Sequence, residues 1–105
     1  MNDLTGQMAD AYEWDGDWSA IVSVTERDRL GEELQRELCS AHLLYGQEAV
    51  ALARRWRRDD VLFGLTDGRF AQVHLTWRQQ SNPEWPATQI YESFEDWKSV
   101  PPEDR

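Results

Sequence analysis

The apolar positions are most regular between residues 26 and 39. Three leucines recur there every four residues, a spacing that puts them on one stripe of a helix: Leu30, Leu34 and Leu38. Thr25 and Asp28 precede the stripe at the spacing with which a Thr hydroxyl caps backbone N–H groups at a helix start. The pattern predicts one main helix over residues 26–39. Because the stripe is narrow, this helix has to pack against another element.

Two apolar runs around an Asp-Gly turn give the strongest strand pattern. Residues 60–65 and 69–77 flank Thr66-Asp67-Gly68, and Asp-Gly between two such runs favours a β-hairpin. Side chains alternate between the faces of a strand, which puts Ala71, Val73, Leu75 and Trp77 on one face and Phe70, Gln72, His74 and Thr76 on the other. We therefore expect Trp77 to be part of the core.

Shorter segments complete the pattern. Residues 20–24 fit either a short strand or the chain that leads into the main helix. Residues 47–57 fit both a helix face and a strand alternation, and their closeness to the following strands favours a strand. Residues 88–91 favour a further short strand. Phe94 and Trp97 then lie three residues apart, as on one face of a short terminal helix.

These elements predict an α+β fold in a single domain over residues 1–105. We expect an antiparallel sheet of three to five strands with the Asp-Gly hairpin at its centre. The main helix and the short C-terminal helix are expected to pack on one face of that sheet. Residues 1–12 fit either a frayed start or a short helix, and residues 100–105 are expected to form a frayed tail.

Tryptophan is unusually frequent, with six in 105 residues. A domain of this size has little apolar area to bury, and one aromatic side chain can bury roughly 150–250 Å². Trp97 is expected in the core together with Trp77. Trp85 stands between two prolines and is expected at a lid or an edge.

The net charge of −9 is unevenly distributed. Residues 1–53 carry eleven acidic and three basic side chains, whereas residues 54–82 carry three acidic and six basic ones. Residues 83–105 are acidic again, with six acids and two cations. Phosphate-backbone binding needs clustered Lys and Arg, so this balance argues against nucleic acid as the partner.

One short basic cluster interrupts this acidity, and it consists of Arg54, Arg55, Trp56, Arg57 and Arg58. It fits an anion or RNA contact with an indole as the stacking surface, and guanidinium stacking on that indole is expected. It also fits a solvated loop or strand end whose arginines pair with the two following aspartates. We favour the second interpretation, because the run is short. The cluster stays a secondary binding candidate, together with His74 and Trp85.

Catalytic and cofactor patterns are missing from the sequence. The two histidines, His42 and His74, form no metal-ligand spacing with each other or with an acid, and Cys39 has no second cysteine. The glycines form no phosphate-binding loop. We therefore expect no cofactor, no metal and no enzyme activity. An enzyme would need both histidines to converge with a carboxylate or with Cys39.

Membrane and export signals are missing as well. No apolar run approaches the ~18 residues of a membrane span, and the first residues lack the pattern of a secretory leader. We expect a cytoplasmic protein.

The acidic segment near the N-terminus is the first candidate for partner binding. Its acids alternate with two tryptophans that we expect outside the β core: Glu13, Trp14, Asp15, Asp17 and Trp18. Aromatic anchors supply buried area in protein interfaces, and charges steer the encounter. The segment therefore suits a basic protein partner. It lacks the ligand spacing of a calcium loop.

Several short motifs together resemble a group of small, single-domain bacterial proteins of uncharacterised function. The motifs are His42-Leu43-Leu44-Tyr45-Gly46, Asp59-Asp60-Val61-Leu62-Phe63, Asp67-Gly68, Val73-His74-Leu75-Thr76-Trp77, Trp85-Pro86-Ala87-Thr88 and Phe94-Glu95-Asp96-Trp97. The resemblance covers about 60% of the chain and leaves out residues 1–25. It implies a small bacterial protein, and it implies no activity or site.

Taken together, the sequence favours a non-catalytic protein-binding domain. An acidic inhibitor or an immunity-type protein that neutralises a basic partner is the leading hypothesis. The alternative is a module that binds a small molecule or a peptide in a pocket lined by Tyr45, His74, Trp77 and Trp85. The oligomeric state stays open.

Overall fold

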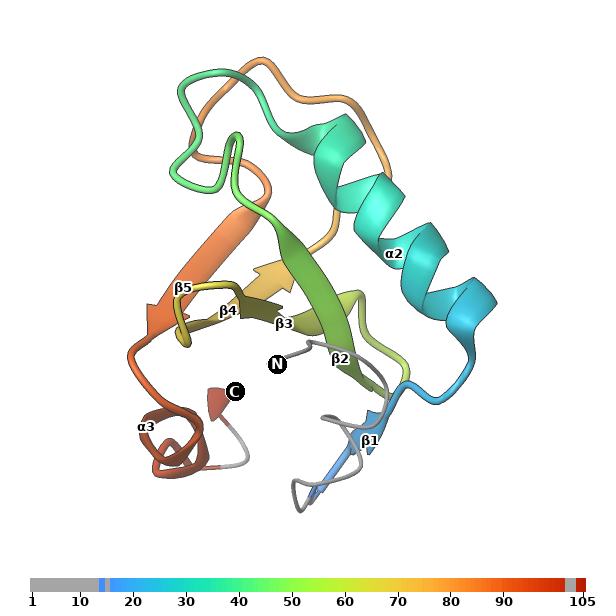
Figure 1. The fold of residues 1–105 in the computed structure, drawn as a ribbon, viewed down its shortest axis with the longest axis vertical. Coiled ribbons are helices and arrows are strands. Elements are labelled where there is room, and N and C mark those ends of the chain that lie inside the picture. Colours follow the sequence, from blue (N-terminus) through green and yellow to red (C-terminus); the bar gives the residue numbers. More distant parts are fainter. Residues whose placement is uncertain (1–13, 15, 102–103) are drawn as a thin grey trace.

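The fold is a five-stranded antiparallel sheet with one helix on each face (Figure 1). The computed structural model describes Trp14, residues 16–101 and residues 104–105. Neighbouring strands follow the order of the sequence, so every connection joins adjacent strands. The elements are β1 (Trp18–Ala20), α2 (Val24–Glu37), β2 (Ala49–Arg55), β3 (Asp60–Leu65), β4 (Phe70–His74), β5 (Ala87–Tyr91) and α3 (Phe94–Lys98). The predicted α+β class is confirmed.

The main helix starts two residues earlier than predicted, and a different residue caps it. The Ser23 side chain accepts a hydrogen bond from the Glu26 backbone N–H at 3.2 Å, whereas Thr25 lies inside the first turn. Ser23 and Glu26 have the same spacing as Thr25 and Asp28, so the sequence offered two equivalent starts. The helix ends at Glu37, because Leu38 is extended.

The two capping alternatives can be distinguished by alanine substitution. Ser23→Ala removes the acceptor at the helix start and should lower the free energy of unfolding by about 1 kcal/mol. Thr25→Ala is the matched control and should change it by less than about 0.5 kcal/mol, because Thr25 is exposed. Urea denaturation followed by circular dichroism measures both. Equal losses in the two variants would contradict the assignment of Ser23 as the cap.

The ambiguous segment 47–57 contains a strand, as favoured. β2 pairs with β3 along its length and with β1 at its end, so its backbone groups are satisfied on both sides there. The register shifts between Ala51 and Ala53, which leaves Leu52 as an extra residue. As a result Ala51 lies in the core beneath α2, and Leu52 and Ala53 lie in the core on the other face.

The predicted hairpin lies at the centre of the sheet, but Trp77 does not belong to its core. β3 and β4 pair from Asp60–His74 to Gly64–Phe70 around the Asp-Gly turn. β4 ends at His74, and only Leu75 continues its buried face. Trp77 has a φ of 60° and is 47% exposed. The expectation of a core position for Trp77 is wrong, because the strand ends at His74 and the alternation of faces does not extend to residue 77.

The two helices cover opposite faces of the sheet, not one face as expected (Figure 1). The leucine stripe of α2 packs on one face, against residues such as Phe63 and Val73. Trp97 of α3 packs on the other, against residues such as Leu62. The reason lies in β3, whose residues from Val61 to Leu65 are all buried, so that both of its faces are covered by other parts of the chain.

The core on the α3 face of the sheet, called the second core, contains aromatic rings that were expected outside the β core. Trp18 lies in β1, is only 5% exposed, and meets Trp97 edge to face at 5.1 Å between ring centroids. Trp14 meets the same ring at 5.6 Å. The expectation that these two lie outside the β core is therefore wrong. Arg105, expected to fray, is buried, with its guanidinium 4.3 Å from the centre of the Trp97 ring.

Candidate functional site

Three tryptophans are exposed in the part of the chain that the structure describes, and all lie at one end of the sheet. In an antiparallel sheet, the end of β2 and β4 is also the start of β3 and β5. Trp56 follows β2, Trp77 follows β4, and Trp85 precedes β5. Their exposed fractions are 64%, 47% and 44%. We call residues 56–59 and 74–87 the sheet end.

Trp77 is held in an unusual conformation by two acids. Its φ of 60° lies in the left-handed region, which a bulky residue rarely adopts. Its backbone N–H donates to Glu37 Oε2 at 2.7 Å, and its indole N–H donates to Asp59 Oδ1 at 3.0 Å. Both ends of the residue are thus fixed while one side of the ring faces solvent. Backbone strain of this kind is concentrated at functional positions.

Glu37 is the buried anchor of this conformation. Its carboxylate is 0% exposed and accepts from the backbone N–H and the hydroxyl of Thr76, at 2.9 and 2.8 Å, as well as from Trp77. Burial raises the pKa of the Glu37 carboxyl, a hydrogen bond with Glu33 raises it further, and the Thr76 and Trp77 donors act against this. Glu37 therefore joins the last turn of α2 to the loop that presents Trp77.

Glu33 completes this pair of carboxyl groups. Burial acts to raise its pKa, but hydrogen bonds with Glu37 and Arg36 outweigh burial and lower it. Arg36 donates to Glu33 through two nitrogens, at 3.0 and 2.8 Å. The pKa of Glu37 is thus raised and that of its neighbour Glu33 is lowered.

His74 is fixed at the sheet end by Asp60. Its Nδ1 lies 2.6 Å from Asp60 Oδ1, and Asp60 Oδ2 lies 3.6 Å from an Arg55 nitrogen. Asp60 and Arg55 side chains are each 13% exposed, whereas the His74 side chain is 52% exposed. Asp60, His74 and Gln72 also line a shallow pocket of about 310 Å³ beside β5. Two consecutive aspartates, Asp59 and Asp60, thus each hold one ring of the sheet end.

The arginine cluster divides into structural and free members. Arg54 binds Glu26 of α2 at 2.6 Å, and Arg55 lies between Asp17 and Asp60, so these two follow the structural interpretation. The predicted stacking is confirmed, because the Arg57 guanidinium lies 4.3 Å from the centre of the Trp56 ring.

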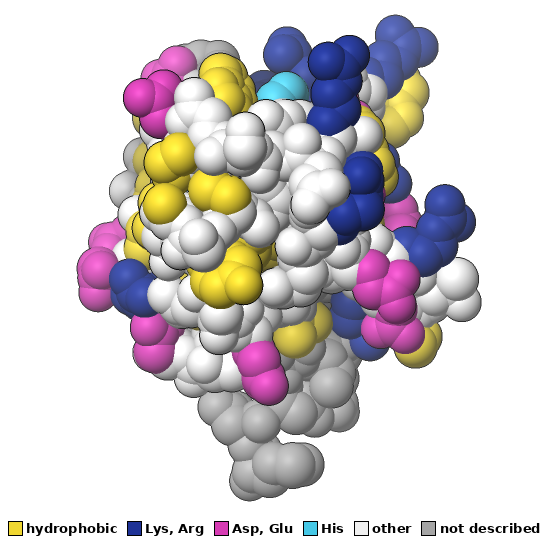
Figure 2. Space-filling view, turned by 90° about the horizontal axis from the view of Figure 1, so that it is seen from above, with side chains coloured by type: hydrophobic (Ala, Val, Ile, Leu, Met, Phe, Trp, Pro, Cys, Tyr) yellow, Lys and Arg dark blue, Asp and Glu magenta, His cyan; other side chains and the backbone are white. Residues whose placement is uncertain are grey.

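Three exposed arginines at the sheet end remain available for binding. Arg57, Arg58 and Arg78 form no ion pair with any residue that the structure describes. Figure 2 shows Lys and Arg side chains gathered at one edge of the surface beside a histidine, with Asp and Glu spread over other parts of that face.

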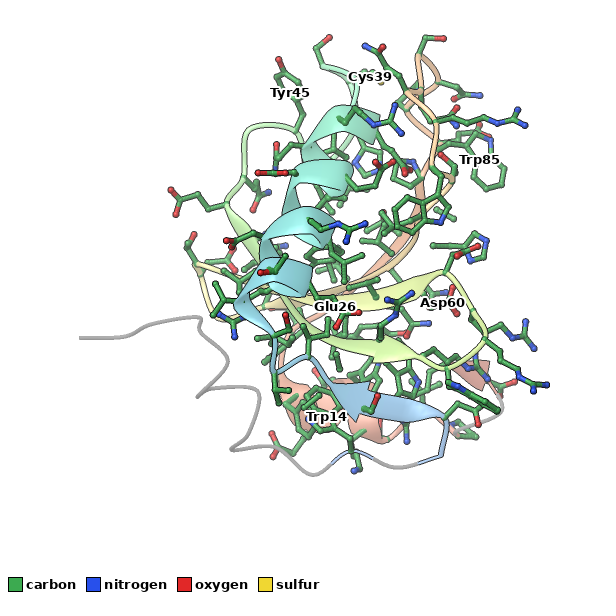
Figure 3. All side chains as sticks on the ribbon, turned by 90° about the vertical axis from the view of Figure 1, so that its right-hand side faces the viewer. Trp14, Glu26, Cys39, Tyr45, Asp60 and Trp85 are labelled. Carbon is green, nitrogen blue, oxygen red and sulfur yellow. The ribbon has the colours of Figure 1, made fainter. Side chains whose placement is uncertain are left out.

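The aromatic residues proposed for one ligand pocket do not come together. Trp85 and Asp60 lie on one side of the molecule, and Tyr45 lies on the far side of α2 (Figure 3). Trp77 instead ends a groove of about 540 Å³ that runs along α2 and is lined by Glu26, Arg54 and Leu30 among others. A pocket lined jointly by Tyr45, His74, Trp77 and Trp85 is therefore not formed.

The acidic segment near the N-terminus is only partly described. Glu13 and Asp15 lie outside the described residues. Asp17 is exposed and lies 3.7 Å from Arg55, and Trp18 is buried. Trp18 is therefore unavailable as a surface anchor, and Trp14 is half-buried against Phe94 and Trp97.

The two histidines do not form a joint site. His42 is buried beside Thr88, its Nε2 lies 3.0 Å from the Pro86 carbonyl, and its Nδ1 accepts from the Leu44 backbone N–H. His74 points from the opposite face of the sheet, because Thr88 pairs with Val73, its neighbour in β4. Cys39 is a free, partly exposed thiol. Among the described residues, no group of His, Cys, Asp or Glu can hold a metal ion.

Sequence reasoning missed Glu37 and the role of Asp59 and Asp60. One signal was available for Glu37, because it follows Leu34 by three residues and so lies on the leucine stripe of α2. A charged residue on an apolar stripe needs a buried partner. For Asp60, counting back from the Asp-Gly turn would have placed it opposite His74. The contact between Asp59 and Trp77 had no sequence signal.

Comparison with known proteins does not identify a family for this chain. The chain matches no protein family, no curated protein and no solved structure. In the described part of the chain, no helix has the length and apolar character to cross a membrane. The resemblance to small bacterial proteins therefore stays a prediction.

Proposed function

We propose that this chain is a non-catalytic protein-binding domain whose contact surface is the sheet end. The observation that carries the proposal is the exposure of Trp56, Trp77 and Trp85 on one end of the sheet, while the other three tryptophans pack together. Exposed large aromatic residues point to a binding surface in a small domain, because an indole in solvent does not contribute to stability as a buried one would. Trp and Arg are also the residues that contribute most to protein interfaces.

The rigidity of the sheet end supports the same function. Trp77 is fixed at its backbone by Glu37 and at its indole by Asp59, and Asp60 holds His74. Side chains that are already ordered lose less conformational entropy when a partner binds. Such a surface suits a defined partner.

The contacts of His74 support a non-catalytic role. A His–Asp pair is two thirds of a nucleophilic triad, and the third member has to be within hydrogen-bond reach of the free ring nitrogen. In the described part of the chain, Asp60 is the only side chain that bonds to His74.

A small-molecule or peptide site beside His74 is the second candidate function. The pocket of about 310 Å³ beneath His74 and Gln89 supports it. Ligand pockets are usually roughly 300–1,000 Å³, and this one lies at the lower limit. Protein binding is therefore the better supported function.

Site-specific photo-crosslinking tests protein binding at the sheet end. A photoreactive benzoylphenylalanine placed at Trp56 or Trp85 should give a covalent protein adduct in the source cells, because both side chains face outward. Glu48 and Asp67 are exposed positions away from the sheet end and serve as matched controls. The adduct should disappear when Trp77→Ala is added. Equal adducts from all four positions, or none from Trp56 and Trp85, would contradict the proposal.

A further inference from the structure

The local charge of the sheet end indicates what kind of partner it fits. Arg57, Arg58 and Arg78 form no ion pair with a described residue. The sheet end holds two acids, Asp59 and Glu84, against these three arginines, and the adjacent Asp60 lies between Arg55 and His74. The sheet end is therefore locally cationic in a chain with a net charge of −9.

We propose that the sheet end binds an acidic polypeptide segment that also carries an apolar side chain. This inference rests on the proposed function and names the chemistry of the partner. Carboxylates would pair with Arg57 and Arg58, and the apolar side chain would pack on Trp77. His74 adds one more polar contact, because Asp60 fixes Nδ1 and the exposed ring is left with Nε2 for the partner.

This assignment reverses the charge expected of the partner. The expectation of a basic partner rested on the acidity of the chain and on Trp14 and Trp18 as exposed anchors among acids, and Trp18 lies in the core. The exposed anchors have arginines beside them instead. Complementary charge steers association and excludes partners of like sign.

A peptide fits this surface better than a nucleic acid. Both would use arginines and exposed indoles. A nucleic acid, however, extends its phosphates well beyond three arginines, and the surrounding chain is strongly acidic. A short acidic peptide ends within the cationic area and avoids this repulsion.

The test uses a blocked peptide of glutamates around one leucine, with a second peptide that has lysine in place of each glutamate. The indole N–H signals of the six tryptophans are followed by NMR during each titration at low salt. The acidic peptide should shift the signals of Trp56 and Trp77, and those of Trp18 and Trp97 should stay, since both are buried. The lysine peptide should shift none of them.

Charge reversal provides the matched control. Arg57→Glu with Arg58→Glu should weaken acidic-peptide binding about tenfold or more. Arg29→Glu with Arg69→Glu makes the same charge change on α2 and beside the far turn, and it should have a much smaller effect. His74→Gln should weaken binding less than the reversal does.

Three outcomes would overturn the inference. The first is equal or stronger shifts with the lysine peptide. The second is tighter binding of a short oligothymidylate than of the acidic peptide, which would indicate a nucleic-acid site. The third is no shift with any probe. If the photo-crosslinking experiment still gives protein adducts in that case, the proposed function stands and only the partner chemistry is wrong.

Discussion

Replacement of Trp97 by alanine should lower the free energy of unfolding by about 3–5 kcal/mol. The Trp97 ring is fully buried, contacts Trp14 and Trp18 edge to face, and donates its indole N–H to Gln72 at 2.9 Å. Its removal leaves a cavity and an unpaired amide oxygen. The total stability of a small domain is about 5–15 kcal/mol, so the variant should be close to unfolding.

Urea denaturation followed by far-UV circular dichroism measures this loss. Trp56→Ala is the matched control, because it removes the same ring from a position that is 64% exposed, and it should cost less than about 1 kcal/mol. Trp97→Phe keeps most of the packing and should fold if the alanine variant does not. Similar losses for Trp97→Ala and Trp56→Ala would contradict the assignment of Trp97 as the centre of the second core.

Replacement of Glu37 by alanine should lower the free energy of unfolding by about 2–4 kcal/mol. The change leaves the partly buried backbone N–H groups of Thr76 and Trp77 without their acceptor, and each unmet donor costs about 1–3 kcal/mol. The left-handed conformation of Trp77 also loses its anchor. Glu32→Ala is the control on the exposed side of α2 and should change stability by less than about 0.5 kcal/mol.

The same site makes stability depend on pH in a direction that follows from the pKa shifts. The pKa of folded Glu37 lies above 4.5, so the folded protein binds more protons than the unfolded chain as the pH rises past 4.5. Its contribution is therefore lost as the pH rises through the folded value. The pKa of Glu33 is lowered, so its contribution is lost as the pH falls below 4.5. The pair should stabilise the fold most near pH 4.5.

Glu37→Gln tests the expected loss of stability above pH 4.5. The amide cannot ionise, but its NH₂ group faces the Trp77 backbone N–H or displaces the acceptor for Thr76, so the variant is less stable than the parent. The difference in free energy of unfolding between the parent and Glu37→Gln should become smaller from pH 4.5 to pH 7. Only the parent has a carboxyl at position 37 that loses its stabilising effect over this range. Parallel profiles of the parent and the variant would show that Glu37 does not carry the raised pKa.

Local sequence patterns predicted most of the secondary structure. The leucine stripe predicted α2, because apolar residues that recur every four positions lie on one face only if the segment is helical. The Asp-Gly turn predicted the β3–β4 hairpin, since Gly68 takes up the positive φ that such a turn needs. The start of α2 was missed, because Ser23 and Thr25 both precede an acid at the capping distance.

The candidate site was predicted in its residue types but not in its geometry. Trp56, Arg57, Arg58, His74 and Trp85 were named from composition and remain exposed. Trp18 was expected at the surface and is buried, whereas Trp77 was expected in the core and is exposed. The exposure of each depends on where its strand ends and on which face of the sheet is covered. The sequence alone could not show that β1 pairs with the end of β2 and carries Trp18 over the second core.

The sequence by itself determined the α+β class, the central hairpin and the main helix, because these depend on repeats and turn residues within a few positions. Only the tertiary structure decided which face each helix covers and which tryptophans reach solvent. Glu37 shows the physical reason. Its bonds to Thr76 and Trp77 span 39 and 40 residues, and this long-range contact turns the chain out of β4 and exposes Trp77.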